Sequence, residues 1–373
     1  MPDLPTQGEF GGIKTSLDRK SCVSVFIIHG VGGFPDDDPD FLMLTIQNRL
    51  NLLKDGEECV REISGDHFET KKIYGYLRRQ DYAGVGAPCD LRIYSLDWSP
   101  TTKHTKENFK CVDHKHIDQR MSLSGKLKDD IVINSLIDAA LYVSNFKDEI
   151  QYPVAQSIRW IQEDAKDQPC HENIVIGFSL GTQILINTLD AMQGYHQKDP
   201  PDPHVKSAAK DFIRQISEVF IFSNVGPLFE LTEMPARHEF HYDASKKCDA
   251  PPPSDTTSIS CQLSCKDTAF GRFVLEKRST CPDFQLVAFS DPNDPLSFIL
   301  DEDSYPPGCP WGNAFINEEV RNVHWSLLGF VNPVDAHIGY SHNEEVIEMV
   351  IFGLNDGANA NCCSCDRQEA KQQ

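Results

Sequence analysis

The stretch NIVIGFSLGTQILI, residues 173–186, places an apolar run before the sequence GFSLG and a helical apolar pattern after it. GFSLG fits the pattern GxSxG, in which a serine lies on a tight turn between a strand and a helix. Gly177 and Gly181 lack the Cβ atoms that would collide with the neighbouring backbone in such a turn. The hydroxyl of Ser179 is therefore expected to project from the carboxyl edge of a sheet, where it could act as a nucleophile.

An orienting carboxylate is expected later in the chain, because a serine hydroxyl attacks only when a base removes its proton and an acid holds that base. After an apolar run at residues 284–289 the sequence reads SDPNDP. Asp294 is predicted to orient the base, and Asp291, three residues earlier, stays open as the alternative.

The predicted base is His337, which comes shortly before a helical apolar pattern at residues 343–354. His324 and His342 are alternatives, but one falls inside a predicted strand and the other at the start of the last helix. The order along the chain is thus serine, acid, histidine.

Short apolar runs alternate with helical patterns along the chain, which is typical of a parallel sheet covered by helices on both faces. We predict strands at residues 23–28, 90–98, 173–177, 218–223, 284–289 and 323–330. Helices are predicted at residues 41–53, 130–145, 150–161, 183–192 and 343–354.

With these features the sequence resembles the α/β-hydrolase superfamily over roughly residues 23–354. The resemblance implies the α/β-hydrolase fold, a mostly parallel sheet with helices on both faces and with inserted loops or cap helices. It also implies that Ser179, Asp294 and His337 form a catalytic triad.

The glycine-rich loop HGVGG at residues 29–33, which contains Gly30, looks like the oxyanion loop of that superfamily. The resemblance implies that the backbone N–H groups of Val31 and Leu180 face the oxyanion that develops during the reaction. Loss of one such donor typically lowers the rate on the order of 10²–10³-fold.

The function that these residues favour is a serine hydrolase that cleaves a carboxylic ester or thioester, with a small-molecule or lipid ester as substrate. The alternative is a non-catalytic binding protein on the same fold, since a fold does not guarantee activity. No cofactor and no metal site are expected, because the sequences DHKH at residues 113–116 and HEFH at residues 238–241 are interpreted as solvated loops.

The amino-acid composition argues against nucleic acid as a partner. The formal net charge of −21 repels nucleic-acid backbones. No apolar run reaches the roughly 18 residues of a membrane-spanning helix, and the first residues show no export signal, so a cytoplasmic protein with mostly reduced thiols is expected.

The domain organisation is predicted as an N-terminal extension at residues 1–20, a hydrolase domain at residues 21–356 and a tail at residues 357–373. The domain carries inserted segments at about residues 101–150 and 241–282. The tail contains Cys362, Cys363 and Cys365, which could be S-acylated and hold the protein at a membrane surface.

Overall fold

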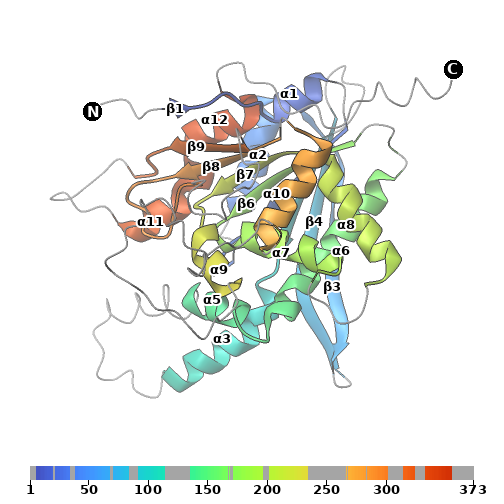
Figure 1. Ribbon diagram of the computed structural model, residues 1–373, viewed down its shortest axis with the longest axis vertical. Coiled ribbons are helices and arrows are strands. Elements are labelled where there is room, and N and C mark those ends of the chain that lie inside the picture. The colour runs from blue at the N-terminus through green and yellow to red at the C-terminus, as the bar shows by residue number, and fades with distance from the viewer. Residues whose placement is uncertain are drawn as a thin grey trace, which may run out of the picture.

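The computed structural model describes most of the chain and contains one nine-stranded sheet with helices on both faces (Figure 1). The predicted α/β class is therefore confirmed. The described residues are 6–19, 22–33, 38–67, 70–83, 91–113, 135–166, 168, 171–195, 201–233, 266, 268–282, 284–300, 314–323 and 332–354.

The sheet is mostly parallel and has the strand order β1-β9-β8-β7-β6-β2-β5-β4-β3. The run from β9 to β5 is parallel, whereas β1, β4 and β3 pair antiparallel at the two sides. The strands are β1 (Thr6–Gln7), β2 (Cys22–Ile28), β3 (Leu53–His67), β4 (Thr70–Ala83), β5 (Leu91–Asp97), β6 (His171–Phe178), β7 (Ile216–Phe222), β8 (Gln285–Ser290) and β9 (Phe315–Glu319).

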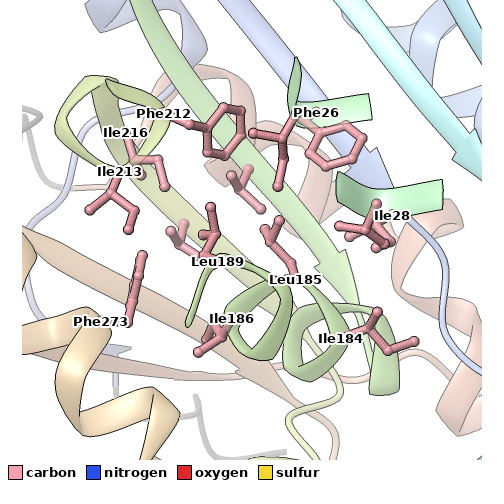
Figure 2. Packing of buried hydrophobic residues seen from close by; sticks show 14 of the residues in the cluster. Phe26, Ile28, Ile184, Leu185, Ile186, Leu189, Phe212, Ile213, Ile216 and Phe273 are labelled. Atoms are coloured by element: carbon pink, nitrogen blue, oxygen red, sulfur yellow. The ribbon is translucent and has the colours of Figure 1, made fainter. Parts of the chain in front are cut away.

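One face of the sheet is covered by a group of helices whose apolar side chains form the larger core. Side chains of successive strand residues point to opposite faces, so Phe26 and Ile28 of β2 contribute to this core. Figure 2 shows them near Leu185 of α7 and Phe212 of α8. The helices with side chains in this core are α5 (Ile137–Tyr142), α6 (Lys147–Ala165), α7 (Leu180–Met192), α8 (Pro203–Gln215) and α10 (Ala269–Thr280).

The other face carries a second core, built from the alternate residues Val23, Val25 and Ile27 of β2. The helices on this face are α1 (Ile13–Asp18), α2 (Asp38–Arg49) and α12 (Glu344–Phe352). Burial on both faces explains why the central strands read as continuous apolar runs.

The short 3₁₀ helix η5 (Gly339–His342) adds Tyr340 to the second core. The other helices of the described ranges are α3 (Pro100–Asp113), α11 (Pro333–Ile338) and α9 (Gly226–Glu233), whose Phe229 packs against the first core. Figure 1 shows α3, α5 and α9 together at one end of the molecule. Segment 101–150, predicted as an insertion, thus contributes α3 and α5 in its described parts.

Three elements differ from the prediction. The segment after α2 forms the long antiparallel hairpin of β3 and β4, which no apolar run signals. The strand β9, which pairs with β8, was not predicted, whereas residues 324–330 of the strand predicted at residues 323–330 lie outside the described part. The segment expected as an N-terminal extension provides β1 and α1, and its Phe10 is fully buried.

The described part of the chain contains both free and disulfide-bonded cysteines, so the expectation of mostly reduced thiols stays a prediction for the chain as a whole. Cys22 and Cys281 are both disulfide-bonded, whereas Cys59 and Cys111 are free. Cys362, Cys363 and Cys365 lie outside the described residues, and their acylation stays a prediction.

None of the helices in the described ranges has the length and apolar character that crossing a bilayer requires.

Candidate functional site

Ser179 lies on a strained turn between β6 and α7. Its backbone has φ 48° and ψ −123°, a conformation that residues other than glycine rarely adopt. A Cβ atom at Gly177 would stand 2.1 Å from Thr182 Oγ1, and one at Gly181 would stand 2.4 Å from His29 O. The two glycines are therefore required by close packing, and the turn directs Ser179 to the carboxyl edge of the sheet, as its motif predicts.

The structure brings Asp294 and His337 together, although they are 43 residues apart in sequence. His337 Nδ1 lies 2.9 Å from Asp294 Oδ1 and 3.1 Å from Oδ2. Asp294 follows β8 and His337 lies in α11, so both reach the same edge of the sheet as Ser179.

The Asp294 carboxylate is surrounded by donors that favour its charged form. It accepts hydrogen bonds from the Tyr340 hydroxyl (3.1 Å) and from Leu296 N–H (3.0 Å). Burial by itself raises the pKa of Asp294, but the hydrogen bond and charge of His337 and a hydrogen bond from Ser223 lower it below its usual value. A charged carboxylate is the form that can orient and stabilise an imidazolium.

The alternative acid, Asp291, has a different set of partners. Its Oδ1 accepts from the backbone and side-chain amides of Asn293, and its Oδ2 accepts from Asn322 N–H at 2.6 Å. These bonds shape the turn after β8 and join it to the segment after β9. Asp291 thus supports the loop, while Asp294 contacts the imidazole.

Ser223 is a member of the site that sequence reasoning missed. Its Oγ lies 3.0 Å from His337 Nδ1, and its backbone has φ 57°. The residue before it, Phe222, accepts a 2.7 Å hydrogen bond from Ser179 N–H. Ser223 therefore joins the nucleophile turn to the histidine, and a polar residue directly after β7 is the only signal in the sequence that could have indicated it.

The glycine-rich loop after β2 packs directly on the turn that carries Ser179. A Cβ atom at Gly30 would stand 2.8 Å from Phe178 O and 2.9 Å from Ser179 Cβ, so only glycine allows this approach. Val31 follows Gly30 in this loop, and Leu180 follows Ser179 as the first residue of α7. The first N–H groups of a helix have no acceptor within the helix, which leaves the Leu180 N–H available to a substrate oxygen.

His29 determines the orientation of this loop. Its ring stacks on Trp98 at 4.9 Å between centroids, and its Nε2 accepts from Trp98 N–H at 3.0 Å. Nδ1 bonds to Gly30 O at 2.7 Å, and Asp97 Oδ1 lies 3.3 Å from Nε2. Trp98 returns a bond from its indole N–H to His29 O at 2.9 Å. His29 is thus a structural residue of the loop.

The remaining candidates lie elsewhere. His342 stacks on Phe41, with 4.5 Å between ring centroids, and its Nδ1 contacts Ser341. His324, residues 114–116 and the sequence HEFH lie outside the described residues. Within the ranges that are described, no group of three or more His, Cys, Asp or Glu residues is arranged to hold a metal ion.

No protein-family model matches the sequence, and no curated protein is similar to it. Among solved structures, acetyl xylan esterase 1 from Thermoanaerobacterium sp. JW/SL YS485 is 10% identical, over 85% of this chain and 97% of that chain, with a TM-score of 0.20. A TM-score this low makes no case for a common activity. The chemistry of the site is therefore inferred from its own residues.

Proposed function

We propose that the protein is a serine hydrolase of the α/β-hydrolase type, which cleaves a carboxylic ester or thioester through an acyl-enzyme on Ser179. The observation that carries this proposal is the contact of His337 with Asp294 beside the strained turn of Ser179. A buried carboxylate, a histidine and a serine at φ 48° form the set of groups that nucleophilic acyl transfer requires.

In the proposed reaction, His337 Nε2 takes the proton of Ser179 while Oγ attacks the carbonyl carbon of the ester. Asp294 holds Nδ1–H of His337, so that Nε2 presents its lone pair to the serine. The N–H groups of Val31 and Leu180 stabilise the oxyanion of the tetrahedral intermediate. The histidine then donates the proton to the leaving alcohol or thiol, and a water molecule, activated in the same way, releases the acid.

Exposed apolar side chains close in sequence to the proposed catalytic residues favour an acyl group with hydrocarbon character. Leu296 follows Asp294 by two residues and is 37% exposed, and Ile338 follows His337 and is 42% exposed. Leu228, in the first turn of α9 beyond Ser223, is 40% exposed. Exposed apolar side chains beside a reactive site are typical of surfaces that bind apolar ligands.

The test is covalent labelling with a fluorophosphonate probe, which reacts with activated serines. Labelling of the wild type is expected and should be lost in Ser179→Ala and in His337→Ala. Ser157→Ala is a matched control, because Ser157 is a buried serine on α6 whose Oγ bonds to Pro153 O. Absence of labelling in the folded wild type would support a non-catalytic binding protein instead.

The acyl preference is measured with p-nitrophenyl esters of increasing chain length. Apolar side chains around the site predict that kcat/KM rises from acetate to longer acyl chains. Replacement of Ile338 by Ser should flatten this rise without abolishing acetate hydrolysis. A preference for acetate in the wild type would contradict a hydrocarbon-binding site.

A further inference from the structure

The glycine-rich loop receives a second support from helices that are far from it in sequence. Gly32 N–H donates a 2.8 Å hydrogen bond to Oδ2 of Asp138, in α5. The same oxygen accepts a 2.6 Å bond from Lys106 Nζ, in α3. Asp138 is fully buried and Lys106 is 8% exposed, so this ion pair is held away from bulk water.

The bonds of His29 and Asp138 act on the two peptide groups that flank Val31. Nδ1 of His29 bonds to Gly30 O, which belongs to the same planar peptide unit as Val31 N–H. Asp138 holds the following peptide unit through Gly32 N–H. Because a peptide unit rotates as one body, the two bonds together determine where Val31 N–H points.

Such support is needed because the loop has little stiffness of its own. Gly32 has φ 86° and Gly33 has φ 95°, conformations that glycine reaches easily and also leaves easily. The proposed oxyanion donor, Val31 N–H, therefore depends on contacts from outside the loop.

The ion pair of Asp138 and Lys106 is not explained by a contribution to stability alone. Asp138 Oδ1 has no hydrogen-bond partner in the described part of the chain, and a buried unpaired carboxylate oxygen costs free energy. A carboxylate near a developing oxyanion would also oppose the reaction by like-charge repulsion. The ammonium of Lys106 offsets this charge while Oδ2 still accepts from Gly32.

We propose that Asp138 is a positioning residue that aims Val31 N–H at the oxyanion, and that Lys106 neutralises it so that the loop can function. This proposal rests on the proposed hydrolase function. It makes the helices α3 and α5 part of the catalytic apparatus, although neither contributes a residue to the triad.

The test compares Asp138→Ala, which removes both bonds, with Asp138→Asn, which keeps an oxygen acceptor for Gly32 N–H. With a p-nitrophenyl ester, kcat of Asp138→Ala should fall by roughly 10²-fold, with little change in KM, since transition-state stabilisation is lost. Asp138→Asn should keep most of kcat. A trifluoromethyl ketone, whose adduct with serine carries an oxyanion, should inhibit Asp138→Ala more weakly in parallel with kcat.

The matched control is Asp190→Ala, which breaks another buried ion pair. Asp190 bonds Arg272 between α7 and α10, at 2.5 and 2.8 Å, and does not touch the loop. Its loss should lower the melting temperature and leave kcat nearly unchanged. An equal loss of kcat in Asp190→Ala and Asp138→Ala, or an unchanged kcat in Asp138→Ala, would overturn the positioning role.

Hydrogen exchange separates this proposal from the proposed function. The Gly32 amide hydrogen, followed in peptides that contain this residue, should exchange faster in Asp138→Ala than in the wild type. This holds whether or not the protein hydrolyses the ester. Unchanged exchange would refute the support of the loop, whereas an inactive wild type would refute the hydrolase. If Asp138→Ala does not fold, the variant Lys106→Met takes its place. Its kcat should be lower than that of the wild type, because the Asp138 carboxylate is then no longer neutralised near the oxyanion. An unchanged kcat in Lys106→Met would overturn the proposal.

Discussion

Replacement of Asp294 by Asn tests the arrangement of the site most directly. In the wild type, Oδ1 accepts from Leu296 N–H and Oδ2 accepts from the Tyr340 hydroxyl, while both oxygens lie within 3.1 Å of His337 Nδ1. An asparagine that keeps the Leu296 bond must place its NH₂ where Oδ2 was. Nδ1–H of His337 then keeps one oxygen acceptor at 2.9 Å, but it faces an NH₂ group in place of Oδ2 and loses the negative charge that stabilises an imidazolium.

The expected size of the rate loss follows from the missing charge. Without the carboxylate, the imidazolium that forms in the transition state is less stable and the ring is held less firmly, and the corresponding substitution in a characterised triad lowers kcat about 10⁴-fold. At about 1.36 kcal/mol for each tenfold change, the activation barrier rises by about 5 kcal/mol. We expect this loss in ester hydrolysis by Asp294→Asn, together with much slower labelling by a fluorophosphonate.

Asp291→Asn is the matched control for this experiment. Asp291 bonds Asn293 and Asn322 and so supports the loop, and loss of one buried acceptor costs on the order of 1–3 kcal/mol of stability. Its melting temperature should therefore fall while kcat stays within about tenfold of the wild type. A larger loss of kcat in Asp291→Asn than in Asp294→Asn would refute the assignment of the acid.

Three further predictions concern other groups. Ser223→Ala should lower kcat by roughly tenfold with little change in KM, because His337 loses one of the contacts that hold its ring; steady-state kinetics that match the wild type would contradict this. Burial raises the pKa of Glu218 well above its usual value, so the stability that it contributes is complete below about pH 4.5 and is lost as the pH rises through the folded pKa. Glu218→Gln should accordingly melt at a higher temperature than the wild type at pH 8, with a gain that shrinks toward pH 4.5, and a gain independent of pH would be the contrary result. In denaturant without a reductant, Cys22 and Cys281 should resist alkylation by iodoacetamide and react only after reduction, which peptide mass spectrometry measures; alkylation before reduction would show that they are not in disulfides.

The sequence predicts the features that depend on neighbouring residues. Apolar runs such as residues 173–177 and 284–289 indicate the buried central strands, because strands with both faces covered carry apolar side chains at successive positions. GFSLG indicates the turn, because close packing around the serine leaves no room for a Cβ atom at either glycine. The α/β class and the position of Ser179 at the sheet edge follow from these local patterns.

The hairpin of β3 and β4 and the strand β9 could not be predicted in the same way. Val60 in β3 is 55% exposed, and charged residues occupy much of both hairpin strands, so no apolar run marks them. β9 has the sequence FINEE, in which only the first two residues are apolar. Such strands are stabilised by backbone pairing with a neighbour, and the sequence of one strand does not reveal its partner.

At the site, sequence alone determined the order of serine, acid and histidine and left Asp291 open beside Asp294. The tertiary structure shows that Asp294 and not Asp291 contacts His337, because only the path of the chain after β8 determines which carboxylate reaches the imidazole. It also revealed Ser223, 114 residues from His337, and Asp138, 106 residues from Gly32. Single polar side chains carry no local pattern, and the hydrogen bonds that give them a role form only when distant segments pack together.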